Sequence, residues 1–280
     1  MIGLFAKCNS EGSSLLDEAE RPSLRDKVFA VTGASSGLGR AICRLLARRG
    51  AQVAMIARSA ALLECLADEL GAAALPLVCD VADEDAVATA FAAIAGRFGR
   101  LDGLVNCAGI GFPVSIAELS TADFMAHFAV NVLGPALCTK AALPLMAQAG
   151  HGDILNVSSL SVEDPFPMLA PYAASKAALE AWSIAAQREL LDRNVRVQVL
   201  RVGGMTDSKF AAGWDPVMAG RAIGKARAQG RFTDRGPPMP PEAAALAAVD
   251  MLSLPHSAHS ELVVLKPMHV LPASSREAGA

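Results

Sequence analysis

Charged side chains are few in this sequence of 280 residues, and neither sign is in excess. They make up 19%, with 25 basic against 28 acidic residues and a net charge of −3, so the basic surface of a nucleic-acid-binding protein is excluded. The six cysteines form no Cys-x-x-Cys pair, which favours reduced thiols over a disulfide framework. The sequence also lacks a signal-peptide stretch and the roughly 20 uninterrupted apolar residues of a membrane span. We expect a soluble, cytoplasmic protein without nucleic-acid or membrane partners.

Apolar residues, in contrast, are abundant at 52%, and the chain is long enough to bury a sizeable core. Short apolar runs alternate with segments of helical spacing from Lys27 onward. The runs predict strands at 28–31, 52–57, 75–79, 103–106, 154–157, 195–200 and 262–265. Helices are expected at about 61–70, 84–98 and 171–191. This alternation predicts an α/β fold, a doubly wound parallel sheet of about seven strands with helices on both faces.

No linker interrupts the alternation, so we predict a single domain over residues 25–268. Residues 1–24 are polar and are expected to form a flexible leader, and residues 269–280 a C-terminal tail. Residues 207–240 are rich in glycine, proline and charge. This excursion would form a substrate lid, or else only a solvated helix face.

A glycine-rich loop follows the first predicted strand. Gly33 permits a tight turn there, while Gly37 and Gly39 remove side chains where the backbone must approach a pyrophosphate. The helix behind the loop offers free N–H groups to phosphate. The predicted phosphate-binding residues are Gly33, Ser35, Ser36, Gly37, Leu38 and Gly39. Glycines that only make a turn are the alternative interpretation.

The second predicted strand ends at Ala57, followed by Arg58. An NAD site usually has an Asp or Glu at this position to accept hydrogen bonds from the ribose. An arginine can instead pair with the 2′-phosphate of NADP. Arg58 therefore favours NADP(H), unless it is an ordinary solvated side chain.

Tyr172, the only tyrosine, precedes Lys176 by four residues. On a helix this spacing places both side chains on one face. A nearby ammonium group favours the phenolate, so we expect a lowered pKa of Tyr172 and a role as general acid or base.

At this point the sequence resembles the short-chain dehydrogenase/reductase family over about residues 24–267. The glycine loop has the form Thr-Gly-x-x-x-Gly-x-Gly, and Tyr172 and Lys176 match the active-site helix. Ser159 precedes the tyrosine by thirteen residues (172 − 159), as the catalytic serine of the family does. Further matches are Asp80-Val81, Asn106-Cys107-Ala108-Gly109 and Asn131.

The resemblance implies a Rossmann-type fold and names a set of site residues. The catalytic residues would be Asn131, Ser159, Tyr172 and Lys176, with Ser159 stabilising charge on the substrate oxygen and Asn131 holding a water linked to the lysine. The cofactor would also contact Asp80, Val81, Asn106, Ala108, Gly109, Tyr172, Lys176, Gly203 and Thr206. No metal site is predicted.

One segment departs from the family pattern. Pro-Gly followed by a threonine usually comes after the sixth strand, and that threonine holds the nicotinamide. Here the segment reads Val202-Gly203-Gly204-Met205-Thr206-Asp207-Ser208. Either Thr206 or Ser208 would supply the hydroxyl, and Thr206 lies nearer the strand end.

Apolar and aromatic residues flank the predicted catalytic groups and favour a hydrophobic substrate. They are Ile110, Phe112, Leu160, Val162, Phe166, Met168, Met205, Phe210 and Trp214. The leading hypothesis is an NADP-dependent oxidoreductase that interconverts a hydrophobic ketone and a secondary alcohol. A catalytically silent cofactor-binding regulator or scaffold is the alternative, and a nucleotide-sugar epimerase or dehydratase fits the glycine motif and length less well. The resemblance also implies a homo-tetramer or homo-dimer, with helices near 121–146 and 172–191 in the interface.

Overall fold

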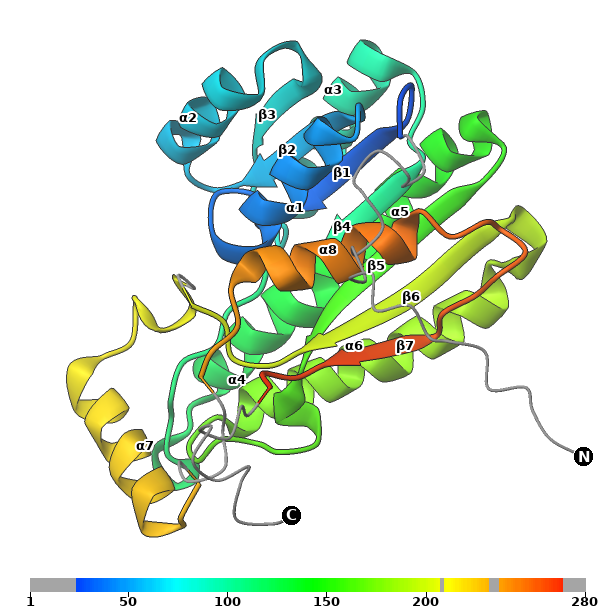
Figure 1. Cartoon of the computed structure of the whole chain (residues 1–280). Coiled ribbons are helices and arrows are strands. Elements are labelled where there is room, and N and C mark those ends of the chain that lie inside the picture. The colour runs from blue at the N-terminus through cyan, green and yellow to red at the C-terminus, as the bar shows by residue number, and fades with distance from the viewer. Residues whose placement is uncertain (1–23, 207–208, 232–236, 269–280) are drawn as a thin grey trace, which may run out of the picture.

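The computed structural model describes residues 24–206, 209–231 and 237–268, and is built on one central sheet (Figure 1). Its seven strands pair in parallel in the order β3-β2-β1-β4-β5-β6-β7. They are β1 (Val28–Thr32), β2 (Gln52–Ala57), β3 (Ala74–Val78), β4 (Gly103–Asn106), β5 (Gly152–Ser159), β6 (Val195–Val202) and β7 (Leu262–Leu265). The strand order reverses at β1, where β4 pairs on its other side, and such a switch point leaves a crevice at the carboxyl ends of the strands. The predicted Rossmann-type sheet is confirmed.

Helices cover both faces of this sheet (Figure 1). They are α1 (Gly37–Arg48), α2 (Ala60–Leu70), α3 (Glu84–Phe98), α4 (Thr121–Phe128), α5 (Gly134–Ala149), α6 (Ala170–Glu189), α7 (Pro216–Ala228) and α8 (Pro241–Leu252). Alternate residues of β2 point to opposite sides, as in any strand. Val53 and Met55 join the core beneath α1 and α8, while Ala54 and Ile56 join the core beneath α3 and α5. Both faces are therefore buried, which is why the strands read as continuous apolar runs.

Several boundaries follow from local signals. Asp83 precedes α3 and accepts hydrogen bonds from the N–H groups of Asp85 and Ala86, as an N-cap does. Gly99 ends the same helix in a left-handed conformation at φ 70°. Strands β5 and β6 are longer than the apolar runs predict, because Asp153 and Ser158 continue the ladder against Arg196 and Arg201.

A short π-helix, η4 (Ala129–Leu133), joins α4 to α5 without a break. The resulting run Thr121–Ala149 has 29 residues and a mean hydropathy of 1.4, and by length and composition alone it passes as a membrane span. In the fold, however, α5 lies against α3, β4 and β5. Core helices of soluble proteins pass the same test, so this run is weak evidence for a membrane span.

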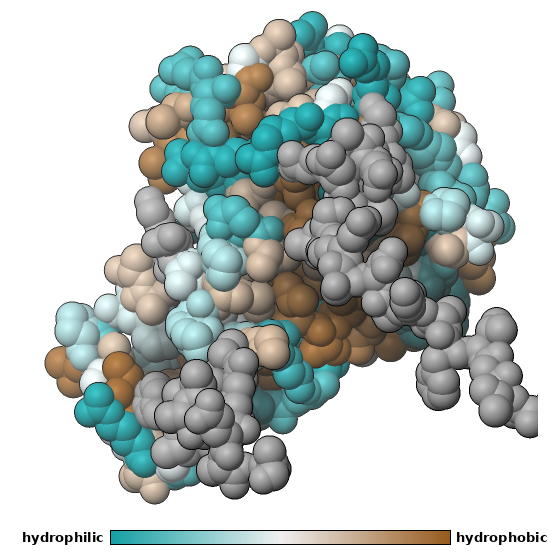
Figure 2. Space-filling view, viewed as in Figure 1, coloured by the Kyte–Doolittle hydropathy of each residue, from teal (hydrophilic) through white to brown (hydrophobic). Residues whose placement is uncertain are grey.

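Helix α7 projects away from the sheet and belongs to the predicted excursion (Figure 1). A bridge between Met205 and Met239 joins the two ends of the excursion. Figure 2 shows apolar residues on the face that carries β7, where Leu262 and Val264 are exposed. The predicted leader (apart from Leu24), the predicted tail and Ser208 lie outside the described residues.

Candidate active site

A cleft of about 580 Å³ lies at the carboxyl ends of the central strands. This volume is typical of a cofactor or small-molecule site, which ranges over about 300–1,000 Å³. Most of the predicted cofactor residues line it: Gly33, Ser35, Ser36, Gly37, Leu38, Gly39, Arg58, Asp80, Val81, Ala108, Gly109, Tyr172 and Lys176. Asn106, Gly203, Thr206 and the catalytic candidates Asn131 and Ser159 are not among the lining residues.

The glycine loop is shaped for close backbone approach. Gly33 has φ 70°, and a Cβ there would lie 2.9 Å from Cα of Ala108. A Cβ at Gly39 would lie 2.4 Å from the carbonyl oxygen of Gly33. Ser36 precedes α1 without a side-chain cap, and the first turn of the helix has no acidic residue. No capping or acidic side chain of the helix thus competes with an anion for this turn, so the loop fits a dinucleotide pyrophosphate.

Thr32 organises the opposite wall of the cleft, a role that the sequence analysis did not assign to it. Its hydroxyl accepts hydrogen bonds of 3.0 Å from the N–H groups of Cys107 and Ala108. Asn106, in contrast, is buried and donates to Oδ1 of Asn156 at 2.8 Å. Its side chain supports the sheet beneath the cleft. A polar residue at the end of an apolar strand, directly before the first glycine, was the available signal for Thr32.

Arg58 lies exposed at the rim of the cleft, immediately after β2. Ala57, the last residue of β2, is buried. On the adjoining rim, Asp80 is exposed and accepts a hydrogen bond of 3.0 Å from the N–H of Ala82. The carboxylate expected of an NAD site at the end of β2 is therefore replaced by an alanine and a guanidinium.

The predicted serine, tyrosine and lysine meet at the inner end of the cleft. Ser159 ends β5, while Tyr172 and Lys176 lie on one face of α6, which begins with Pro171 in its first turn. The Ser159 side chain lies close enough to the Tyr172 hydroxyl to lower its pKa. Lys176 is buried, and its Nζ donates to the carbonyl oxygen of Val157 at 2.8 Å.

The pKa values of these groups differ from the expectation for Tyr172. Burial raises the pKa of Tyr172 to about 12, although the neighbouring Ser159 hydroxyl acts to lower it. Burial also lowers the pKa of Lys176 to about 8. The cost of placing charge in this apolar site outweighs the attraction that the i, i+4 spacing suggests. In this state the phenol is a proton donor.

Two polar side chains hold the segment 109–112 beside the catalytic groups. Asn131 lies in the π-helix η4. Its side-chain oxygen accepts a hydrogen bond from the N–H of Ile110 at 2.9 Å. Its side-chain nitrogen donates to the carbonyl oxygen of Ile110 at 2.8 Å and to Ser175 Oγ at 2.9 Å. His127, which the sequence analysis did not single out, accepts from the N–H of Phe112 at 3.2 Å. Asn131 is thus a positioning residue in this structure.

The excursion closes the substrate end of the cleft. Trp214 Nε1 donates to the carbonyl oxygen of Gly111 at 2.6 Å, and Arg221 pairs with Glu118 at 2.8 Å. Of the nine apolar residues expected to line this end, the lining contains Ile110, Phe112, Met205, Phe210 and Trp214. Leu160, Val162, Phe166 and Met168 are absent from it.

The segment after β6 is the part of the site that departs from the expected pattern. A Cβ at Gly203 would lie 2.6 Å from Cδ of Pro267, so this glycine serves close packing. Thr206 is exposed, and its N–H donates to the carbonyl of Met239 at 2.9 Å. Met205 is the residue of this segment that lines the cleft. Ser208, the other candidate, lies outside the described residues.

Comparison with known proteins agrees with this geometry. The chain matches the family described as short chain dehydrogenase over residues 27–216. It is 38% identical over 178 residues to a 3-oxoacyl-[acyl-carrier-protein] reductase of Bos taurus, which covers 64% of this chain and 75% of that protein. The solved structure of an alcohol dehydrogenase from Thermococcus sibiricus, complexed with 5-hydroxy-NADP, aligns with a TM-score of 0.73 and 30% identity over 88% of this chain and 98% of that one. A 3-ketoacyl-(acyl-carrier-protein) reductase from Brucella melitensis, complexed with NADH, aligns with a TM-score of 0.73 and 29% identity over 86% of this chain and 97% of that one.

Proposed function

The chain belongs to the short-chain dehydrogenase family, and on that premise we propose that it is an NADP-dependent oxidoreductase. It would interconvert a hydrophobic ketone and a secondary alcohol. The observation that carries this proposal is one continuous cleft, which runs from the glycine loop to Tyr172, with Ser159 beside the phenol. A dinucleotide and a small carbonyl compound need such an arrangement, because the reacting carbon must lie beside both the cofactor and a proton donor.

Bound NADP(H) would supply or accept the hydride, and the residues of this chain would handle the proton. Tyr172 holds its proton at the phenol oxygen and would donate it to the carbonyl oxygen during reduction. Ser159 would donate a hydrogen bond to the same oxygen and stabilise the charge that develops there. Lys176, anchored to Val157 by its 2.8 Å hydrogen bond, would favour the phenolate after proton transfer. In the oxidation direction Tyr172 would act as the base.

The apolar substrate end supports a hydrophobic ketone rather than a free sugar. Phe112, Phe210 and Trp214 offer aromatic surface without a charged group among them, and such a surface gains little from hydroxyl groups. The bovine and Brucella relatives are described as reductases of 3-oxoacyl and 3-ketoacyl compounds. Acyl chains and simple ketones are therefore the first substrates to test.

NADP preference is proposed from the end of β2. Arg58 lies at the cleft rim, where it would pair with a 2′-phosphate, and Ala57 offers no acceptor to the ribose of NAD. The Thermococcus structure holds an NADP derivative and the Brucella structure holds NADH. The cofactor therefore varies among the relatives, and the preference has to be read from the residues of this chain.

We also propose a homo-oligomer, a homo-tetramer or a homo-dimer, built through α4–α5 and α6. These neighbouring helices expose Phe124, Met125, Leu133 and Ile184, and exposed apolar side chains can be covered by association. Light scattering after size exclusion would give the mass. A monomer at micromolar concentration would reject this part of the proposal.

A cytoplasmic location remains part of the proposal. The five cysteines that the structure describes are all free thiols, and unpaired thiols are typical of a reducing compartment. Fractionation of the source cells with an antibody against the chain would test it.

The decisive experiment supplies NADPH with a panel of apolar ketones and 3-oxoacyl thioesters. Consumption of NADPH that depends on the ketone supports the proposal, and parallel reactions with NADH give the cofactor preference. Tight binding of NADPH without turnover of any panel member would favour the alternative, a cofactor-binding regulator.

A further inference from the structure

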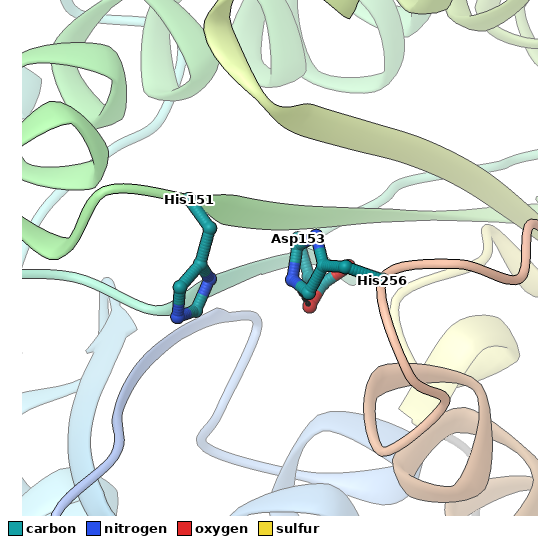
Figure 3. A group of neighbouring side chains, drawn as sticks. All are labelled: His151, Asp153 and His256. Carbon is teal, nitrogen blue, oxygen red and sulfur yellow. Dashed lines mark ion pairs between the residues drawn. The ribbon is translucent and has the colours of Figure 1, made fainter.

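Three potential metal ligands meet at the amino ends of the strands, whereas the active-site cleft lies at the carboxyl ends. They are His151, directly before β5, Asp153 within β5, and His256 in the loop between α8 and β7 (Figure 3). One ligand atom from each lies within 4.8 Å of the other two. The proposed oxidoreductase chemistry uses none of them.

Asp153 is held so that one oxygen stays available. Its Oδ1 accepts a hydrogen bond of 2.6 Å from Nε of Arg196, while Oδ2 lies 3.4 Å from Nε2 of His256. Two ligands of a tetrahedral Zn²⁺, with bonds of about 2.0–2.1 Å, are separated by about 3.4 Å. The carboxylate and the imidazole thus already have the spacing of zinc ligands.

Arg196 also positions the loop that carries His256. Its two terminal nitrogens donate to the carbonyl oxygens of Leu254 and Pro255 at 3.1 Å each, and to Ala258 at 2.5 Å. The loop is therefore fastened to β6 on both sides of His256. The His256 side chain is 33% exposed, so an ion can reach it from solvent.

His151 offers the third nitrogen. Its Nε2 lies 3.3 Å from Oδ1 of Asp102 and 3.1 Å from Nζ of Lys27. Its Nδ1 is buried and has no hydrogen-bond partner within the described ranges. Because the Lys27 ammonium can only donate, Nε2 accepts from it in the metal-free protein and the ring proton lies on Nδ1. A metal ion at Nδ1 would move that proton to Nε2, where Asp102 is placed to accept it, as carboxylates usually do for metal-binding histidines. An unpaired buried nitrogen is costly, and a metal ion would satisfy it.

We propose that His151, Asp153 and His256 form a zinc site that fastens the α8–β7 loop to the start of β5. Two imidazoles and one carboxylate suit Zn²⁺ better than Mg²⁺ or Ca²⁺, which prefer oxygen ligands. Lys27, Arg100 and Arg196 lie next to the carboxylates of Asp102 and Asp153. These cations reduce the attraction for a divalent ion, so the affinity is expected to be micromolar. The sequence by itself predicts no metal site, because the three ligands are distant along the chain.

The test uses the full chain, dialysed against EDTA, and titrates it with ZnCl₂ by calorimetry. We expect one zinc per chain and an affinity at least tenfold weaker in His256→Ala. His259→Ala is the matched control, since this histidine lies on the same loop and its Nε2 is within 3.0 Å of the carbonyl oxygen of Val197. The control should bind zinc like the wild type.

A second measurement follows thermal unfolding. Zinc at about 20 times its Kd should raise the Tm of the wild type and of His259→Ala by about 3–6 °C, and leave His256→Ala unchanged. Equal zinc affinity in wild type and His256→Ala, or no binding at millimolar zinc, would overturn the proposal. Neither result would bear on the oxidoreductase activity, because the active-site cleft lies at the opposite, carboxyl ends of the strands.

Discussion

The ring of Phe210 lies 4.9 Å from the ring of Tyr172 and occupies the space next to Gly111. A Cβ at Gly111 would lie 2.4 Å from Cζ of Phe210 and 2.8 Å from Cδ2 of Tyr172. Trp214 secures this arrangement, because its ring packs on Phe210 at 5.7 Å and its Nε1 binds the Gly111 carbonyl. The excursion thus places an aromatic side chain directly against the proposed proton donor.

Phe210→Ala should weaken substrate binding more than it slows chemistry. Loss of the ring removes aromatic contact worth about 1–2 kcal/mol with an apolar ketone, so KM should rise by about tenfold. Since Tyr172 and Ser159 are untouched, kcat should change by less than about threefold. Steady-state kinetics with one ketone measures both. Val217→Ala serves as control, because this exposed apolar residue of α7 belongs to the same excursion and does not line the cleft. An unchanged KM in Phe210→Ala would contradict the assignment.

Tyr172→Phe should abolish most of the turnover. The variant keeps the ring but loses the titrating proton, and removal of a general acid typically costs about 10²–10⁴ in rate. Cofactor affinity, followed by NADPH fluorescence, should remain within a few-fold of the wild type. Near-full activity in this variant would end the proposed mechanism.

Ala57→Asp should reverse the cofactor preference. The wild type is expected to favour NADP, because a charge-assisted hydrogen bond from Arg58 contributes about 1.5–3 kcal/mol, or about one to two decades in kcat/KM. The new carboxylate would accept from the ribose of NAD and repel the 2′-phosphate of NADP.

The comparison needs kcat/KM for both cofactors with one substrate. Arg58→Gln is the matched control, which should lose the preference without reversing it. If the wild type uses NAD as well as NADP or better, Arg58 is only a surface residue.

Lys176→Met should change how stability depends on pH. The pKa of Lys176 falls from 10.5 to about 8 on folding, because burial disfavours the ammonium. Below pH 8 the Lys176 ammonium is charged in both the folded and the unfolded protein, so the full free-energy cost of burying that charge lowers the stability of the fold. Between about pH 8 and 10.5 the unfolded state binds more protons, so this group makes the wild type more stable as pH rises.

The methionine variant has no such group, so its stability relative to the wild type should be greatest at neutral pH. That relative stability should decrease by about 2 kcal/mol on going to about pH 9.5. Urea unfolding at both pH values measures it. The measurements stay below pH 10 because of Tyr172, whose pKa rises from 10.0 to about 12 on folding. Above pH 10 this group makes the folded protein less stable as pH rises, which opposes the effect of Lys176. If the free energies of unfolding of the two proteins changed in parallel with pH, folding would not lower the pKa of Lys176.

The sequence by itself determined the features that depend on neighbouring residues. The predicted bounds of β2, β4, β7 and α3 coincide with those of the structure, because apolar runs, helical spacing and end signals act over a few residues. The glycine loop and the i, i+4 pair of Tyr172 and Lys176 are local in the same sense. Their backbone requirements are visible without knowledge of what packs around them.

Only the tertiary structure decided the features that depend on distant contacts. The hydroxyl of Thr32 meets the N–H groups of Cys107 and Ala108 across the β1–β4 pair. The rings of His151 and His256 lie 4.6 Å apart although the two residues are distant along the chain. The pKa of Tyr172 moves in the direction opposite to that predicted from the sequence, because desolvation depends on every segment that covers the phenol. Burial is a property of the assembled chain, and neither spacing nor composition of a short segment contains it.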